Sequence, residues 1–540
     1  MTSLGQAPCD EGVLRTAPAR PGGTDRNKPW VLATTILGSA MAFIDGSVVN
    51  VGIPVIQAEL STTFSAVQWV VNGYMLMLGA LILVGGAAGD EFGRRRVFNL
   101  GVALFTAASV ACGLAPNAEM LIATRVLQGV GGALLVPGSL AIISAVFPKA
   151  ERGRAIGTWA GFSALTTAFG PVLGGWLVDT FSWRAIFFLN VPLALIVLSL
   201  SVWRVPESRG GAAGTGVDWV GGALSTLGLA GLAYGLTALS DRHWTDPVVL
   251  VPLFGGVVVL ALFLRWEAHA KAPMMPLGLF RSPSFSGANG MTLMLYMAMS
   301  GAMFFIPFNL IRIEGYSPTQ AGAAFLPFTL VIGGLSRWSG GLIDRYGART
   351  PLIVGPAITS IGFVLFAVPG IGGSYWTTVF PAMLVLGFGM AVGVAPLTTT
   401  VMGAVENRYA GIASGINNAV ARVGGMLSVA LLGAVAVGVF GAALEKRVAG
   451  QPLAPDVRRA LEAEVPKLGE AKVPPSVQGD ERWLLEQALD DSFVHSFRVV
   501  MVIAAGLALA SGMVAAATIG PRRQAAGTPK FRTPPVRAPE

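Results

Sequence analysis

Fourteen predominantly apolar runs divide this chain of 540 residues, and a run of about 20 such residues can cross a bilayer as one helix. The runs begin near residues 30, 67, 97, 119, 155, 185, 217, 247, 286, 319, 350, 375, 410 and 496. Charged residues make up only 12% of the chain, about half the proportion in a soluble domain. We therefore expect an all-α polytopic membrane protein with fourteen transmembrane helices.

Basic residues indicate the orientation of the chain. The N-terminal segment, every second short loop and the C-terminal segment hold 23 Lys and Arg, whereas the other short loops hold only Arg184, Arg242 and Arg312. Positive residues accumulate on the cytoplasmic side of the cell membrane, so we expect both termini in the cytoplasm, with a disordered tail at 1–29 and a second tail at 520–540. The Ala-, Gly- and Val-rich composition indicates a bacterial protein. The polar stretch 445–495 is expected outside, either as short amphipathic helices over the outer mouth or as a partly ordered spacer.

An internal repeat predicts the architecture. Residues 86–95 read GAAGDEFGRR and residues 340–349 read GGLIDRYGAR, with four identities 254 residues apart: Gly86/Gly340, Asp90/Asp344, Gly93/Gly347 and Arg95/Arg349. The repeat predicts two six-helix bundles, at 30–204 and 286–519, with two helices inserted at 217–265. Repeated bundles with a binding site at their interface are typical of secondary transporters.

Two ionisable residues fall inside predicted spans. Asp45 lies in FIDGSVVNVGIPVI (43–56) and Arg125 begins RVLQGVGGALLVPG (125–138). A charged side chain at membrane depth is costly, which makes each a candidate functional residue. Asp45 can exchange protons during transport, or it can pair with a basic group and only lock two helices together. Arg125 either faces a polar partner or extends to the membrane surface.

These segments resemble the major facilitator superfamily, and the number of spans resembles its 14-helix drug/proton antiporter branch. The resemblance extends from Phe43 to Arg422. It implies that the 86–96 loop and its repeat form a conformational latch between the bundles, where a plain turn between helices is the simpler interpretation. The latch residues are Gly86, Asp90, Gly93, Arg94, Arg95, Asp344, Gly347 and Arg349.

The resemblance also assigns roles inside the spans. It implies that Asp45 and Arg125, the latter within an R-x-x-Q-G pattern, couple transport to protons. The segment GFSALTTAFGPVLGG (161–175) resembles the motif that marks exporters, through Gly170, Pro171, Gly174 and Gly175. Ser47 stands where the family usually has Thr, and Ala348 stands where the first latch copy has Arg94, so the second latch is expected to be weaker.

The substrate site is less constrained. Asn417, Asn418 and Arg422 either line a cavity or form hydrogen bonds between helices, and Tyr74 and Gln128 are further cavity candidates. Two Cys, three His and the lack of a P-loop sequence argue against a metal site, a cofactor and an enzyme. We expect a monomeric, proton-coupled exporter of lipophilic small molecules such as drugs, in contact with lipid and without a nucleic-acid partner. The alternatives are export of one endogenous metabolite, or an uptake symporter or facilitator of the same fold.

Overall fold

The computed structural model describes residues 27–210, 216–406, 409–451 and 453–520, and some side chains within α6, α13, α14 and α17 are not described. The described residues form helices and no strand, which confirms the all-α fold. The expected tails 1–29 and 520–540 lie outside the described residues, apart from residues 27–29 and 520.

The first bundle begins at Lys28, next to Pro29, which suits the first turn of a helix because that turn needs no N–H donor. Its helices are α2 (Lys28–Glu59), α3 (Phe64–Phe92), α4 (Arg94–Gly113), α5 (Ala118–Val146), α6 (Lys149–Thr180), α7 (Ala185–Phe188) and α8 (Asn190–Arg204). The inserted pair is α9 (Trp219–Ala238) and α10 (Pro247–Glu267).

The second bundle repeats this order with more interruptions. Its helices are η2 (Leu277–Arg281), α11 (Pro283–Phe308), the π-helical turn η3 (Asn309–Ile313), α12 (Pro318–Ala323), α13 (Leu326–Gly340), α14 (Leu342–Tyr346), α15 (Arg349–Ala367), α16 (Tyr375–Gly403), α17 (Ala410–Val448), α18 (Pro455–Glu464), η5 (Val465–Glu470) and α19 (Gly479–Thr518).

Thirteen helical segments of the described chain are long and apolar enough to cross a membrane. The fourteenth predicted span corresponds to α6, which is 32 residues long but is not among the thirteen. Several side chains of α6 lie outside the described residues. The expected count of fourteen is therefore not confirmed.

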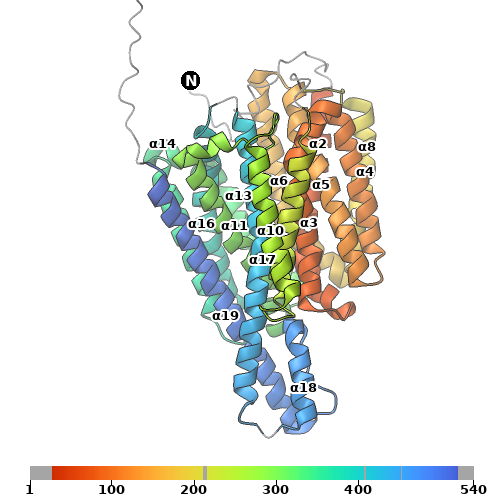
Figure 1. The fold of residues 1–540 in the computed structure, drawn as a ribbon, viewed down its shortest axis with the longest axis vertical. Coiled ribbons are helices and arrows are strands. Elements are labelled where there is room, and N and C mark those ends of the chain that lie inside the picture. The colour runs from red at the N-terminus through yellow and green to blue at the C-terminus, as the bar shows by residue number, and fades with distance from the viewer. Residues whose placement is uncertain (1–26, 211–215, 407–408, 452, 521–540) are drawn as a thin grey trace, which may run out of the picture.

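The inserted helices lie along the seam between the bundles. α3 packs against α17 across that seam, and α9 packs against both of them as well as against α10. Figure 1 shows α10 in front of this seam, between the N-terminal and C-terminal helices. The predicted insertion therefore bridges the two bundles.

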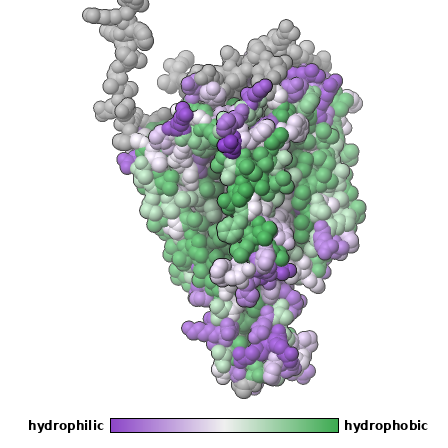
Figure 2. Space-filling view, viewed as in Figure 1, coloured by the Kyte–Doolittle hydropathy of each residue, from purple (hydrophilic) through white to green (hydrophobic). Residues whose placement is uncertain are grey.

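The polar segment 445–495 is mostly helical. α17 continues to Val448 and α19 already begins at Gly479, so the last helix starts well before the predicted residue 496. Leu461, Leu485 and Leu489 are buried, as expected for amphipathic helices rather than a spacer. Figures 1 and 2 show this segment, with α18, as a largely hydrophilic projection beyond the apolar band of the bundles. We call this side of the molecule the α18 end.

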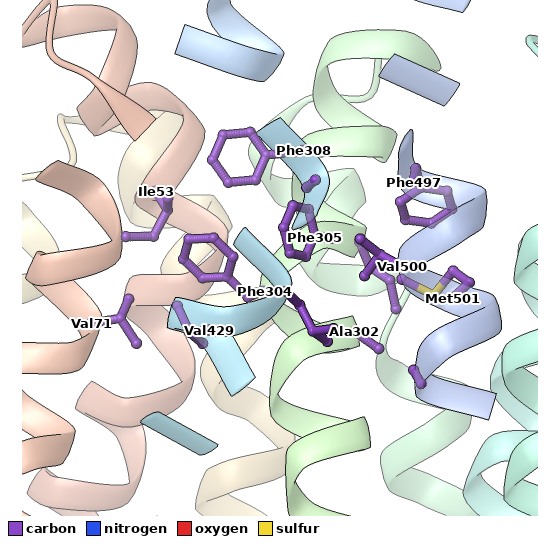
Figure 3. Packing of buried hydrophobic residues seen from close by; sticks show 14 of the residues in the cluster. Ile53, Val71, Ala302, Phe304, Phe305, Phe308, Val429, Phe497, Val500 and Met501 are labelled. Atoms are coloured by element: carbon purple, nitrogen blue, oxygen red, sulfur yellow. The ribbon is translucent and has the colours of Figure 1, made fainter. Parts of the chain in front are cut away.

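An aromatic cluster joins the bundles toward the α18 end. Phe64 of α3 packs against Phe304, Phe305 and Phe308 of α11, with 5.6 Å between ring centroids in each pair. All four are essentially inaccessible to solvent. Figure 3 shows the three α11 rings between Ile53 and Val71 of the first bundle and Phe497 and Val500 of α19. Aromatic pairs in such edge-on or tilted arrangements add about 0.5–1.5 kcal/mol each beyond burial.

Candidate functional site

Asp45 and Arg125 meet inside the first bundle. Arg125 Nη1 lies 2.5 Å from Asp45 Oδ2, and Gln128 Nε2 donates to Asp45 Oδ1 at 2.8 Å. Arg125 Nη1 also donates to Gln128 Oε1 at 2.7 Å. The exposed fraction is 2% for Asp45, 1% for Arg125 and zero for Gln128. The three side chains form one closed hydrogen-bonded network between α2 and α5.

The remaining surroundings of Arg125 fix its position. Its Nε donates to Val70 O at 2.9 Å, and its Cζ lies 4.4 Å from the centroid of the Tyr74 ring. Tyr74 is buried, and its hydroxyl donates to Ala42 O at 3.3 Å. The suggestion that Arg125 extends to the membrane surface is wrong, because this residue has buried partners within the bundle. Tyr74 and Gln128 belong to this network and are closed to a substrate in this state.

The latch loop between α3 and α4 is held by carboxylates. Arg94 Nε donates to Asp90 Oδ1 at 2.9 Å. Gly93 has a φ of 112°, which glycine adopts at little cost. The Glu207 carboxylate, from the segment after α8, accepts from the backbone N–H groups of Arg95 at 3.0 Å and Arg96 at 3.2 Å. Glu207 thereby caps α4, a role for which the loop motif gave no signal.

The second copy of the latch motif has the same turn but different contacts. Gly347 has a φ of 76°, and Arg349 Nη2 donates to Ala516 O of α19 at 2.8 Å. The side chain of Asp344 lies outside the described residues. A Cβ added to Gly86 would lie 3.7 Å from Pro137 Cβ, whereas a Cβ added to Gly340 would have no described atom within 4 Å. The two copies therefore share a backbone turn and pack against unlike neighbours.

The glycine motif of α6 lies where three helices cross. A Cβ added to Gly170 would clash with Ser47 of α2, and one on Gly174 would lie 2.8 Å from Val48 Cγ1. One on Gly175 would lie 2.5 Å from the carbonyl carbon of Pro318 in α12. Conversely, a Cβ on Gly322 of α12 would lie 2.6 Å from the carbonyl carbon of Pro171. Gly175 and Gly322 let the backbones of the two bundles touch, whereas Gly170 and Gly174 let α6 pack closely on α2.

Polar contacts reinforce this crossing at the α18 end. Asp179 Oδ2, near the end of α6, accepts from Ser317 Oγ at 2.9 Å and from Thr319 N at 2.8 Å, at the start of α12. Gln57 Nε2 of α2 donates to Lys467 O of η5 at 2.8 Å. Neither Asp179 nor Gln57 was predicted from the sequence, because each becomes a bundle contact only through its partner in the other half.

The three polar candidates on α17 have different surroundings. Asn417 Nδ2 donates to Asn289 Oδ1 at 3.2 Å and to Thr292 Oγ1 at 2.7 Å, so it joins α17 to α11. Asn418 is exposed and Arg422 is half-buried, and neither has a hydrogen bond or ion pair to the described residues. Arg422 Cβ lies 3.0 Å from the position of a Cβ added to Gly79, on the same helix as Tyr74. It therefore brings an uncompensated positive charge close to the Asp45 network.

A bundle pair of this kind, with a buried carboxylate and guanidinium at membrane depth, defines a secondary membrane transporter. Residues 35–429 match the model of the Major Facilitator Superfamily, and the chain belongs to that family. It is 34% identical to the multidrug resistance protein Stp of Mycobacterium tuberculosis over 488 residues, covering 89% of this chain and 90% of that protein.

Two further comparisons extend this result. The chain is 32% identical to the tetracenomycin C resistance and export protein of Streptomyces glaucescens over 517 residues, with 93% of each chain covered. Among solved structures, it superposes on a bacterial homologue of the human lysosomal transporter Spinster with a TM-score of 0.64. That match covers 92% of this chain and 99% of the other at 17% identity, so it supports the fold alone.

Proposed function

We propose that this transporter exports lipophilic small molecules such as antibiotics in exchange for protons. The observation that carries the proposal is the buried Asp45–Arg125 pair, since ionisable residues inside transmembrane helices are rare and mark proton or substrate pathways. Relatives that match about nine-tenths of the chain or more are named as resistance and export proteins. These names support transport out of the cell.

Proton exchange would act through the partner of Asp45. Arg125 neutralises the Asp45 carboxylate in the present arrangement. A proton on Asp45 would remove that attraction and leave Arg125 with Gln128 and Val70 O as its polar partners. Loss of an attraction between α2 and α5 would change the packing of the helices that line the bundle interface. Protonation and helix movement are thus linked through one contact.

Alternating access would use the crossing of α6 and α12. At the α18 end, Gly175 and Gly322 bring the bundles into backbone contact. The positive-inside bias directs the α18 end outward. We therefore interpret the conformation as closed to the outside.

The test uses everted membrane vesicles with an acidic interior, in which an exporter exchanges interior protons for added substrate. A panel of neutral, cationic and acidic lipophilic compounds is added, and proton efflux is followed with a pH-sensitive dye. Substrate-dependent proton efflux that requires the protein supports antiport. Substrate uptake that is independent of the proton gradient would indicate a facilitator, and movement of protons and substrate in the same direction would indicate a symporter.

We expect Arg422→Gln to reduce transport of acidic lipophilic compounds about tenfold, which corresponds to about 1.4 kcal/mol of lost interaction. Transport of neutral compounds should change little, because they do not use the uncompensated charge. Lys271→Gln, at an exposed position, removes one positive charge away from the bundle interface and serves as the control. An equal loss for both compound classes would contradict a role in binding acidic substrates.

The latch loop gives a second expectation. Glu207→Gln keeps one acceptor oxygen but loses the carboxylate that holds two N–H groups of α4, so we expect a stability loss of about 1 kcal/mol and slower transport. Glu91→Gln removes an exposed carboxylate from the same loop and is the matched control. Thermal unfolding and transport rate are measured on both variants, and indistinguishable results would exclude a role for the Glu207 cap.

A further inference from the structure

Two carboxyl groups meet where the inserted helices α9 and α10 come together, at the end opposite α18. Asp218 is the N-cap of α9, and its Oδ1 accepts from Gly221 N at 2.8 Å and from Trp266 Nε1 at 2.9 Å. Glu267 is the last residue of α10, and its Oε2 accepts from Met275 N at 3.0 Å. One oxygen of each carboxyl group therefore accepts hydrogen bonds that hold the ends of α9 and α10 in place.

The other two oxygens lie against the same glycine, Gly221. Asp218 Oδ2 and Glu267 Oε1 are buried and have no hydrogen-bond donor among the described residues. They lie 2.5 Å and 2.8 Å from the position that a Cβ on Gly221 would occupy, and the two carboxyl groups are within hydrogen-bonding range of each other. Glu267 as a whole is only 3% exposed. Two carboxylate oxygens are both acceptors, so this contact is favourable only when one of them carries a proton.

The neighbouring charged groups do not neutralise the pair. Arg265 on α10 and His269, Lys271 and Arg281 in the following segment are exposed, and within the described chain none forms an ion pair with either carboxyl group. On α3, Asp90 is paired with Arg94 and Glu91 is exposed. On α17, Arg422 lies against Gly79 in the middle of α3. The environment of Glu267 is set first by its burial, then by the N–H group of Met275, the Asp218 carboxyl group and the N–H group of Met274.

We propose that Asp218 and Glu267 form a second proton-binding site, in which one proton lies between Asp218 Oδ2 and Glu267 Oε1. This site is separate from the Asp45 network and lies in the inserted helices. The bound proton lets α9, α10 and the 268–276 segment close around two acids without a counter-ion. Its loss places two negative charges against each other in a buried position, which loosens the connection between α10 and α11.

The test measures thermal stability and infrared spectra of the purified full-length protein in lipid nanodiscs, from about pH 5 to about pH 9. The folded chain holds the shared proton more tightly than the separate carboxyl groups of an unfolded chain, so stability falls as the pH rises. Glu267→Gln replaces the shared proton with an amide donor. Its melting temperature should vary less with pH than that of the unmodified protein and should exceed it at the alkaline end.

The infrared spectrum identifies the proton directly. The unmodified protein should show the carbonyl band of a protonated carboxyl group that disappears as the pH rises, and Glu267→Gln and Asp218→Asn should each lack this band. Gly221→Ala, which places a methyl group against both oxygens, should lose the band as well. Gly255→Ala on α10 has no described atom within 4 Å of its new Cβ and should keep the band.

Three results would overturn the proposal. The first is a band that survives in Glu267→Gln, since the proton would then reside elsewhere. The second is an equal loss of stability at every pH in Glu267→Gln, which would indicate packing alone. The third is alkaline stability that is restored by sodium or calcium ions, which would make the pair a cation site. None of these measurements depends on transport, so they remain informative whatever the exporter assay gives.

Discussion

Asp45→Asn is expected to abolish proton-coupled transport, with substrate-dependent proton efflux falling to the level of empty vesicles. Asparagine fills the same space and retains an acceptor for Arg125, but it cannot take up a proton. It also leaves the buried Arg125 without its carboxylate, and removing one partner of such a pair costs about 3–5 kcal/mol. The measurement is the everted-vesicle assay, normalised to the amount of folded protein in the membrane.

A double variant separates the two consequences of this substitution. Asp45→Asn combined with Arg125→Gln removes both charges of the pair, so folding should recover while proton coupling stays absent. Asp480→Asn, at an exposed position in the first turn of α19, is the control for loss of one acidic group. Proton-driven transport that persists in Asp45→Asn would assign the coupling proton to another residue.

Gly175→Ala is expected to reduce transport at least tenfold by separating α6 from α12. The added methyl group would lie 2.5 Å from the carbonyl carbon of Pro318 and 2.7 Å from Thr319 Cα. Both are backbone atoms, so the strain can be relieved only by moving one helix away from the other. The contact between the bundles at the α18 end would then open, and the cycle would lose its outward-closed state.

The matched control for this prediction lies on the same helix. Gly157→Ala is the same chemical change at a position without a described atom within 4 Å of the new Cβ. Alanine favours a helix over glycine by about 1 kcal/mol, so this variant should be as active as the unmodified chain. The opening itself is measured by disulfide formation between cysteines at positions 179 and 319. Unchanged cross-linking in Gly175→Ala would contradict the expected separation of α6 from α12.

The structure shows which helices the inserted pair contacts, whereas the sequence predicted only that both segments cross the membrane. Their apolar character predicted two spans and nothing more. In the folded chain, α9 packs against α3 and α17, one helix from each bundle, and Gly222 lies against Val84. A helix pair in this position must adjust whenever α3 and α17 move relative to each other. The Asp218–Glu267 pair lies at the end of the inserted pair that leads into the second bundle.

Local chemistry made several features predictable from the sequence. Long apolar runs predicted membrane helices because an unpaired backbone group in hydrocarbon costs several kcal/mol. The repeated turn with Gly93 and Gly347 predicted the duplicated bundles because both positions need a positive φ. Asp45 was a candidate functional residue because its charge conflicted with its apolar surroundings. Each of these inferences used only residues close together in the chain.

Other features depended on contacts between distant segments, which the sequence does not encode locally. Asp45 and Arg125 are 80 residues apart, and only the packing of α2 against α5 makes them one pair. Glu207 reaches the start of α4 from a segment more than 110 residues later. Asp218 and Glu267 share buried space only because α9 and α10 fold back on each other. The apolar pattern thus determined which segments enter the membrane, and tertiary packing decided which charges neutralise each other there, because a charge in a low-dielectric interior is stable only beside a specific partner.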